Sequence, residues 1–519
     1  MELKFIHILG PALVVVAFLM WGKGMVNREK GKNFRPFPAM IMMLIAIGFH
    51  VFLPFYKEVP DLVSFGGKFL DQLTLALMNF GIGMMIDAGY LSFKKYEHPK
   101  VFWVPAVLAL LLSCGIFLIS KAWTTVCELN SPKNNAATVQ ALMELGADDN
   151  ISEVEYILEK YKVQYEKAFP TIALSADEDL AQYYLLYVDS SYYTPLANEL
   201  KADIENIDNV EANKVFTLDD PKSDIFSTEN TTPFKANDPF LKNQWYAEKL
   251  GYDKVYETLS ALSPKRKAKV AILDTGVDGL HEDLQPVFAD SPANKDGHGH
   301  GTHCAGLVGA ATNNKVGIGS LNWDGKFIEV RGFQALSEDG SGSYEMISQA
   351  IIDAADAGSD VISMSLGGPA PFGAPKVMKD AVKYAQKKGA ILVVAAGNSS
   401  SDAKSYSPAN IEGVICVAAV DENFNKAYFS NTNTSLKMPI AAPGVNILSS
   451  VPNGQYVQMN GTSMATPIVA GLVGILRSLN PSLTTADAYK VLKETGLESA
   501  DASKAGKTIQ PLAAIEKVK

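Results

Sequence analysis

The chain has 519 residues, a formal net charge of −10 and 47% hydrophobic residues. This length exceeds what one compact core normally holds, so two or more structural units are expected. The acidic balance, without a basic stripe interleaved with aromatic residues, argues against nucleic acid as a partner.

The first 120 residues have a membrane-like composition. A spanning helix needs about 20 mostly apolar residues, and four apolar stretches approach or meet that length. We therefore predict an α-helical transmembrane bundle in region 1–121, with the lipid bilayer as a partner. The four stretches are 5–21, 38–56, 74–91 and 102–120.

Basic residues gather in the loops that follow the first and third stretches. Cytoplasmic loops hold the Lys/Arg excess, so both loops are predicted to lie inside, and everything after Ser120 outside. The expected localisation is a multi-pass protein of the cell membrane with an extracytoplasmic C-terminal part. The basic residues are Lys23, Arg28, Lys30, Lys32 and Arg35 in one loop and Lys94, Lys95 and Lys100 in the other.

Two features of the membrane region have alternative interpretations. Stretch 5–21 is open to assignment as a cleavable signal peptide, although its positive charge lies mainly after the apolar run and no small-residue cleavage site follows. Asp87, in stretch 74–91, is either a functional intramembrane carboxylate or one that reaches interfacial water near the cytoplasmic end.

A small α+β domain is predicted ahead of the C-terminal half. Residues 122–150 have the composition of a polar connector with one short helix, residues 151–219 show strand, helix and strand signals, and residues 220–237 form a proline-containing linker. The signals within 151–219 are a capping box of Ser152 and Glu155, a buried strand over Ala181–Val188, a helix opened by Thr194-Pro195, and a closing strand over Val210–Leu218.

Three short segments of the C-terminal half supply an acid, a base and an alcohol. Asp274 follows the strand-like run Lys269–Leu273 in VAILDTGVD, His300 opens a predicted helix in DGHGHGTHCAG, and Ser463 precedes a predicted helix in GTSMATP. A serine hydroxyl becomes a good nucleophile when an imidazole takes its proton, and the imidazole needs a carboxylate to fix its tautomer.

These three segments, with their flanking glycines and in the order Asp, His, Ser, resemble the subtilisin-like serine proteases, or subtilases. The resemblance covers 238–519 and implies a doubly wound α/β fold with a mostly parallel sheet, and peptide-bond hydrolysis of protein or peptide substrates. It implies catalytic roles for Asp274, His300 and Ser463, an oxyanion donor in Asn398, and pairing of substrate with the backbone of Ser365, Leu366 and Gly367.

The resemblance also implies a structural Ca²⁺ bound by Asp238, Asp283 and Asn314, and no organic cofactor. Hard oxygen ligands suit Ca²⁺, and the alternative is that these are ordinary loop residues.

A roomy apolar pocket is predicted for the substrate side chain that precedes the cleaved bond. Its walls are Ala and Gly residues near Ser365–Gly367 and Ala395–Gly397, and Tyr406-Ser407-Pro408 closes it.

The position of the small α+β domain directly before the protease resembles the inhibitory propeptides of subtilases, which implies a self-processed zymogen. A structural or partner-binding domain is the alternative. For the whole protein, the alternative is a membrane sensor or assembly protein whose four-span bundle is the main functional unit.

Cys304 is expected to be a buried free thiol. The other possibility is a thiol that reacts with mercurials because it lies close to His300.

Overall fold

In the computed structural model, residues 138–218, 234–289, 291 and 293–519 are described, and all belong to one compact unit, Ala136–Lys519. The four predicted spans lie outside the described residues. Among the described residues, one helix is long and apolar enough to cross a membrane, namely α13 (Thr462–Leu479), and 94% of its apolar window is buried inside the protein. We therefore describe α13 as a core helix.

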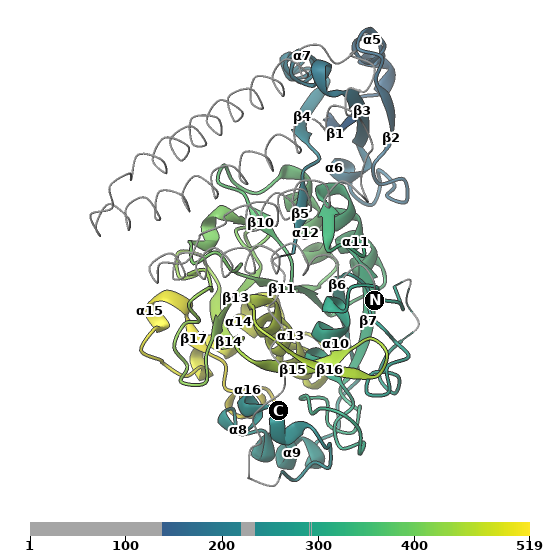
Figure 1. The fold of residues 1–519 in the computed structure, drawn as a ribbon. Coiled ribbons are helices and arrows are strands. Elements are labelled where there is room, and N and C mark those ends of the chain that lie inside the picture. The colour runs from purple at the N-terminus through teal and green to yellow at the C-terminus, as the bar shows by residue number, and fades with distance from the viewer. Residues whose placement is uncertain (1–137, 219–233, 290, 292) are drawn as a thin grey trace, which may run out of the picture. The chain divides into compact units, whose positions relative to one another are not determined.

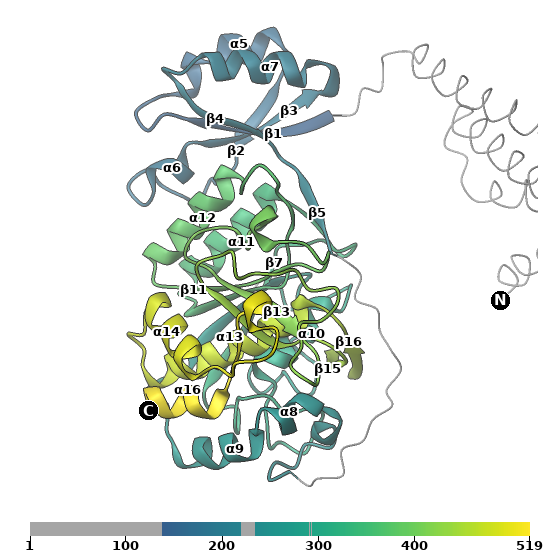
Figure 2. The same cartoon turned by 90° about the vertical axis from the view of Figure 1, so that its left-hand side faces the viewer.

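The N-terminal part of the described chain is a four-stranded antiparallel sheet in the order β2-β3-β1-β4. Helices α5 and α7 cover one face of this sheet (Figure 2) and share an apolar core with it. The elements are β1 (Thr138–Leu145), η3 (Ile151–Glu153), α5 (Glu155–Lys160), β2 (Gln164–Lys167), α6 (Glu178–Ala181), β3 (Tyr183–Asp189), α7 (Ser190–Ala202), β4 (Ile207–Ala212) and β5 (Val215–Thr217).

The first correction to the sequence interpretation concerns the segment 122–150, which was expected to be a connector. It contains β1, a central strand of the small sheet whose last five residues are buried. The polar residues Gln140 and Glu144 made this segment resemble a connector. Their partners, Asn213 and Lys376, come from distant parts of the chain.

Three local boundaries in this domain also differ from the prediction. The capping box is formed by Asn150 and Glu153, since asparagine caps as well as serine does. Helix α7 begins at Ser190, capped by Asp189, and contains Pro195 in its interior. The single predicted closing strand is divided into β4 and β5, and β5 pairs with a strand of the C-terminal domain.

The C-terminal domain is built on a seven-stranded sheet in the order β17-β14-β13-β11-β9-β6-β7, in which neighbouring strands pair in parallel (Figure 1). Along β6, Val270 and Ile272 face one apolar cluster and Ala271 and Leu273 face another. The predicted α/β fold with a mostly parallel sheet is thereby confirmed. Its strands are β6 (Ala268–Asp274), β7 (Ile328–Gln334), β9 (Val361–Met364), β11 (Ile391–Ala395), β13 (Ile415–Val420), β14 (Pro439–Pro443) and β17 (Lys507–Thr508).

Helices cover both faces of this sheet, as expected of a doubly wound fold. One layer contains α9 (Tyr252–Ala261), α10 (His300–Gly309), α13 and α16 (Pro511–Val518), and the other contains α11 (Tyr344–Asp356) and α12 (Lys376–Lys387). The remaining elements are η4 (Leu241–Asn243), α8 (Trp245–Lys249), β8 (Ser341–Ser343), β10 (Gly368–Pro369), η5 (Ala403–Ser405), β12 (Tyr406–Ser407), β15 (Ile447–Val451), β16 (Gln455–Met459), α14 (Thr485–Thr495) and α15 (Ala502–Ala505).

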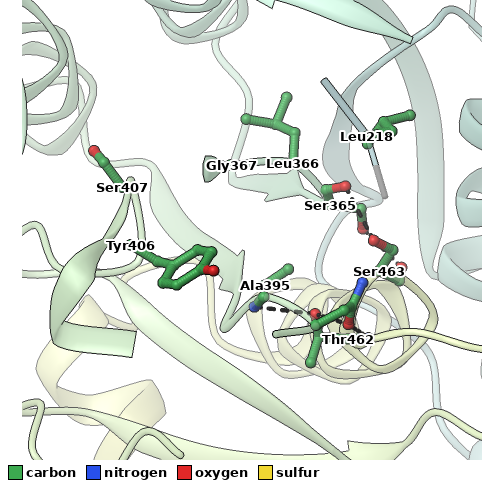
Figure 3. Close-up of a pocket in the computed structure, with 11 residues that line it drawn as sticks. Leu218, Ser365, Leu366, Gly367, Ala395, Tyr406, Ser407, Thr462 and Ser463 are labelled. Carbon is green, nitrogen blue, oxygen red and sulfur yellow. Dashed lines mark hydrogen bonds between the residues drawn. The ribbon is translucent and has the colours of Figure 1, made fainter. Parts of the chain in front are cut away.

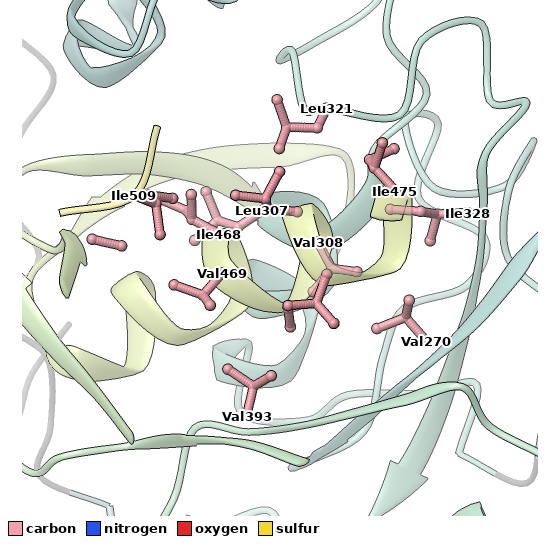
Figure 4. Close-up of a cluster of buried hydrophobic side chains, with 14 of the residues drawn as sticks. Val270, Leu307, Val308, Leu321, Ile328, Val393, Ile468, Val469, Ile475 and Ile509 are labelled. Atoms are coloured by element: carbon pink, nitrogen blue, oxygen red, sulfur yellow. The ribbon is translucent and has the colours of Figure 1, made fainter. Parts of the chain in front are cut away.

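Helices α10 and α13 pack closely at the centre of the first layer (Figure 4). A Cβ atom at Gly471 would lie 2.6 Å from the carbonyl oxygen of Val308, so glycine is required where the two helices cross. Because α10 carries His300 and α13 carries Ser463, this crossing sets the separation of those two residues.

The small sheet packs against α11 and α12. The Tyr183 hydroxyl donates to Asp380 at 2.8 Å, and Glu211 accepts from the amides of Lys376 and Val377 at the start of α12. Lys376 also forms an ion pair with the fully buried Glu144, whose Oε2 has no partner among the described residues.

Glu144 makes this packing pH-dependent. Burial raises its pKa from 4.5 to about 7, although hydrogen bonding to Lys376 opposes the rise and the charge of Asp380 adds to it. Packing therefore takes up a proton. The contribution of Glu144 to the packing is strongest below about pH 4.5 and weakens as the pH rises through 7, by about 300-fold in equilibrium constant.

We expect hydrogen exchange of the β1 and β4 amides, corrected for the intrinsic rate, to accelerate between pH 5 and 8 in an uncut chain. Glu144→Gln should abolish the dependence, whereas Asp177→Asn, which removes the ion pair with Lys387, should preserve it. Equal pH dependence in wild type and Glu144→Gln would contradict the assignment.

Candidate active site

The C-terminal end of β6 positions Asp274. Ligand-binding side chains in parallel sheets gather at such strand ends. Asp274 is fully buried, and its Oδ1 lies 2.7 Å from Nδ1 of His300 and accepts a bond from the Thr275 amide at 2.8 Å. The structure thus brings together the predicted acid and base.

His300 is the first residue of α10, as predicted. A Cβ atom at Gly301 would lie 2.0 Å from the Gly276 carbonyl oxygen, so glycine lets the helix approach the end of β6. Burial lowers the pKa of His300, but the charge of Asp274 and the hydrogen bond to it outweigh burial and raise the pKa above its ordinary value. Its Nε2 is buried and has no partner among the described residues, so no protein group occupies this atom.

Ser463 is the second residue of α13 and is 8% exposed. Its hydroxyl donates to the Ser365 carbonyl at 3.2 Å and makes no hydrogen bond to Nε2 of His300. The Cys304 sulfur contacts both His300 and Ser463, since it lies 4.0 Å from Nδ1 of His300 and 3.5 Å from the backbone carbonyl oxygen of Ser463.

Two hydrogen-bond donors converge beside Ser463. A Cβ atom built on Gly461 would lie 3.4 Å from the Ser463 nitrogen and 3.6 Å from Nδ2 of Asn398. Oδ1 of Asn398 accepts from the amide and the hydroxyl of Thr462, both at 2.9 Å, which directs Nδ2 outward. Asn398 lies three residues beyond the end of β11.

Pro467 lies in the second turn of α13, because the helix begins at Thr462. A proline has no N–H, so the carbonyl of Ser463 lacks an intrahelical partner. That carbonyl accepts instead from the Ser365 hydroxyl at 2.8 Å and from Cys304. Pro467 therefore frees an acceptor that attaches the start of α13 to the neighbouring segment Ser365–Gly367.

A pocket adjoins Ser463, and Figure 3 shows Leu218 near Ser365 and Ser463, with Tyr406 on the opposite side. Its volume is about 30 Å³, close to that of one water molecule. The pocket in this structure is therefore smaller than the roomy one that was expected, and Tyr406, which was predicted to close it, lines it together with Leu218. The lining residues are Leu218, Ser365, Leu366, Gly367, Ala395, Gly397, Asn398, Tyr406, Ser407, Thr462 and Ser463.

The chain's own strand β5 lies beside this pocket. It pairs antiparallel with β8, the Leu218 amide donates to the Gly340 carbonyl at 2.9 Å, and the Phe216 ring lies 5.1 Å from that of Tyr344. Residues 341–343 were not among the predicted substrate-binding residues. Their alternation of serine and glycine gave no strong strand signal.

The neighbouring histidines have other environments. Nε2 of His303 lies 3.1 Å from the carbonyl oxygens of Ile447 and Val457, and burial together with the charge of His300 lowers the pKa of His303 to about 3. The ring of His298 lies 6.3 Å from that of His300. Cys304 is a buried free thiol as expected, and burial raises its pKa.

The predicted calcium ligands lie near one another. Asp283 accepts from the side chain of Asn314 at 2.9 Å and from the amide of Ile318 at 2.8 Å, whereas Asp238 accepts from the amides of Asn313 and Asn314. Burial raises the pKa of Asp283 to about 7 and that of Asp238 to about 6, and the charge of Asp238 contributes to the rise at Asp283. Two buried, mutually repelling carboxylates beside an amide form a donor set that suits a hard cation.

Sequence reasoning missed Asp296, a buried carboxylate in the loop before α10 that accepts from Thr275, His298, Gly299 and Thr302. Its one sequence signal was an acidic residue just ahead of a predicted helix start.

Comparison with known proteins identifies relatives of this domain. Residues 265–510 match the profile of the Subtilase family, Peptidase_S8. Thermitase from Thermoactinomyces vulgaris is 38% identical over 253 residues, covering 47% of this chain and 86% of thermitase. Subtilisin DY from Bacillus licheniformis is 39% identical over 247 residues, covering 46% of this chain and 87% of that protein.

Among solved structures, fervidolysin from Fervidobacterium pennivorans has a similar fold. The TM-score is 0.59 at 24% sequence identity, covering 73% of this chain and 61% of the fervidolysin chain.

Proposed function

Because this chain belongs to the subtilase family of serine endopeptidases, we propose that Asp274, His300 and Ser463 are its catalytic triad. The observation that carries the assignment is the 2.7 Å contact between buried Asp274 and His300, with the open Nε2 of His300 in the same active site as Ser463.

The proposed reaction follows the geometry. Ser463 Oγ attacks the peptide carbonyl carbon while Nε2 of His300 takes its proton, which then passes to the leaving amine. Asp274 holds the imidazole and stabilises its positive charge. A water molecule, activated by the same imidazole, then releases the acyl group from Ser463.

Asn398 Nδ2 and the Ser463 amide are proposed to bind the oxyanion of the tetrahedral intermediate. The Ser463 amide belongs to the first turn of α13, where N–H groups lack intrahelical partners. The backbone of Ser365–Gly367 is proposed to pair with the extended substrate, together with residues 341–343.

Asn398→Ala should reduce kcat by about 10²- to 10³-fold and leave KM nearly unchanged, because the oxyanion forms only after attack. Steady-state hydrolysis of a chromogenic peptide measures both constants. Asn423→Ala, which truncates an exposed loop asparagine, is the matched control and should retain full activity. A rise in KM of about 10²- to 10³-fold with kcat unchanged would contradict the oxyanion role.

We also propose that the protease is made as a zymogen. The support is the position of Val215–Leu218, which pairs with β8 and reaches the pocket beside Ser463 as a bound peptide product would. In this proposal the small α+β domain is an inhibitory propeptide, and self-cleavage follows shortly after Leu218.

The apolar stretches before Ser120 are proposed to anchor the precursor in the cell membrane with the protease outside. This proposal rests on their length and on the placement of Lys and Arg. Cleavage after Leu218 would cut the chain between the anchor and the protease.

Calcium is proposed to be bound by Asp238, Asp283 and Asn314. When bound, it would neutralise the two buried carboxylates and hold the loop around residue 314 against the segment that contains Asp238. It takes no part in peptide hydrolysis.

Mass spectrometry of membrane and soluble fractions from cells that express the full chain tests the triad, the zymogen and the membrane anchor together. We expect an N-terminal product that ends shortly after Leu218 in the membrane fraction. A serine-directed sulfonyl fluoride should add to Ser463 and abolish hydrolysis. Modification of another serine would overturn the triad assignment. An uncut, fully active chain would overturn the zymogen, and a precursor found only in the soluble fraction would overturn the anchor.

A further inference from the structure

The carboxylate of Asp296 lies between the two elements that carry the acid and the base. It is 9% exposed. Oδ1 accepts from the Thr275 hydroxyl at 2.9 Å and from the amides of His298 and Gly299 at 3.0 and 2.8 Å. Oδ2 accepts from the amide and the hydroxyl of Thr302 at 2.9 and 2.7 Å.

The two threonines that donate to Asp296, Thr275 and Thr302, also accept backbone amides near Asp274 and His300. Thr275 follows Asp274 directly, and its hydroxyl oxygen accepts the Gly301 amide at 3.1 Å. The Thr302 hydroxyl oxygen accepts the Asp278 amide at 2.9 Å. The end of β6 and the start of α10 are thus joined by two hydroxyl groups that meet at one carboxylate.

The direction of every hydrogen bond in this network is defined. Both threonine oxygens accept an amide N–H, so each hydroxyl hydrogen is available to donate, and Asp296 is the nearest acceptor for each. The Thr275 oxygen is 2.9 Å from Asp296 but 3.3 Å from Asp274. Five donors therefore point at Asp296, and an ionised carboxylate, which only accepts, satisfies all of them.

We propose that Asp296 is a positioning residue that fixes the Asp274–His300 hydrogen bond by holding Thr275 and Thr302. The inference rests on the proposed triad. Asp296 does not contact substrate in this role. It acts through the backbone on either side of the acid and the base, and its negative charge also suits the N-terminus of α10, a helix of 10 residues.

Asp296→Asn preserves size but turns an NH₂ group toward donors, so the β6–α10 link should loosen. Small displacements of catalytic groups cost about 10- to 100-fold in rate, and we expect a fall of that size in kcat with KM unchanged. Because a weaker bond to Asp274 lowers the pKa of His300, the acid limb of the kcat/KM profile should move to lower pH.

The matched control is Asp360→Asn. Asp360 is also buried, with 4% side-chain exposure, and it holds Arg266 and Arg477 at the other end of the sheet, before β9. This variant should lower Tm without altering kcat or the pH profile at 25 °C. The low-field proton resonance of the His300 Nδ1–H should shift in Asp296→Asn and stay in place in Asp360→Asn.

If Asp296→Asn does not fold, Thr275→Val and Thr275→Ser carry the test. Valine removes the hydroxyl and should reproduce the loss of kcat and the resonance shift, whereas serine keeps the hydroxyl and should restore both. A folded Asp296→Asn with kcat within twofold of wild type would overturn the inference, as would reduced kcat with an unshifted resonance and pH profile. An inactive wild type would instead overturn the proposed function.

Discussion

Replacing Ser463 by alanine is expected to reduce kcat by about six orders of magnitude, because no other group in the site can form the acyl-enzyme. The Ser365 hydroxyl is committed to the Ser463 carbonyl, and the thiol of Cys304 is buried with a raised pKa. Hydrolysis of a chromogenic peptide by purified protein, at concentrations that reveal trace activity, provides the measurement.

Self-processing gives a second measurement on the same variant. Full-length Ser463→Ala should remain uncut, whereas wild type should yield a product that ends shortly after Leu218. Ser478→Ala is a matched control, because Ser478 is a buried serine of the same helix whose hydroxyl bonds to the Ile475 carbonyl. It should cleave normally. Residual activity in Ser463→Ala above about one thousandth of wild type would exclude Ser463 as the nucleophile.

The sequence predicted the elements that carry the catalytic residues because their chemistry constrains short local segments. Asp274 had to end a strand, and His300 and Ser463 had to begin helices, so apolar runs and glycines beside them were informative. The structure places Asp274 at the end of β6 and His300 at the start of α10. The glycine at 301 has a local reason as well, since it lets α10 approach Gly276.

Long-range contacts were not predictable in the same way. The charged residue Glu144 made its segment resemble an exposed loop, so strand β1 was not predicted. In the structure Glu144 is buried beside Lys376. Asp296 was not singled out from the sequence, because its contact with Thr275 joins residues that are 21 positions apart. The pocket was expected to be roomy from its small wall residues, whereas its volume is about 30 Å³ and its lining includes Leu218, which was not among the predicted pocket residues.

Alternatives of similar local strength explain the boundary errors. Asn150 and Ser152 are both suitable N-caps, and the structure uses the former. Asp189 caps α7 ahead of Thr194, so the helix starts earlier and Pro195 falls inside it. In both places two nearby residues have similar capping propensity, so the local sequence did not decide between them.

Replacing Asp274 by asparagine is expected to reduce kcat by about 10⁴-fold. Asparagine keeps the size of the side chain and an oxygen that accepts the Thr275 amide, but it removes the negative charge 2.7 Å from Nδ1 of His300. The imidazolium formed during attack then lies buried without a counter-ion, and the neutral imidazole can be held in the wrong tautomer.

The pH dependence of the same variant separates charge from geometry. Burial lowers the pKa of His300, and Asp274 is the main cause that raises it. Without that charge the pKa falls. Since the base acts in its neutral form, the acid limb of kcat/KM must move to lower pH even as the plateau drops. A reduced plateau with an unmoved limb would show that Asp274 only orients the ring. Asp360→Asn should show neither change, because its carboxylate neutralises arginines remote from the imidazole.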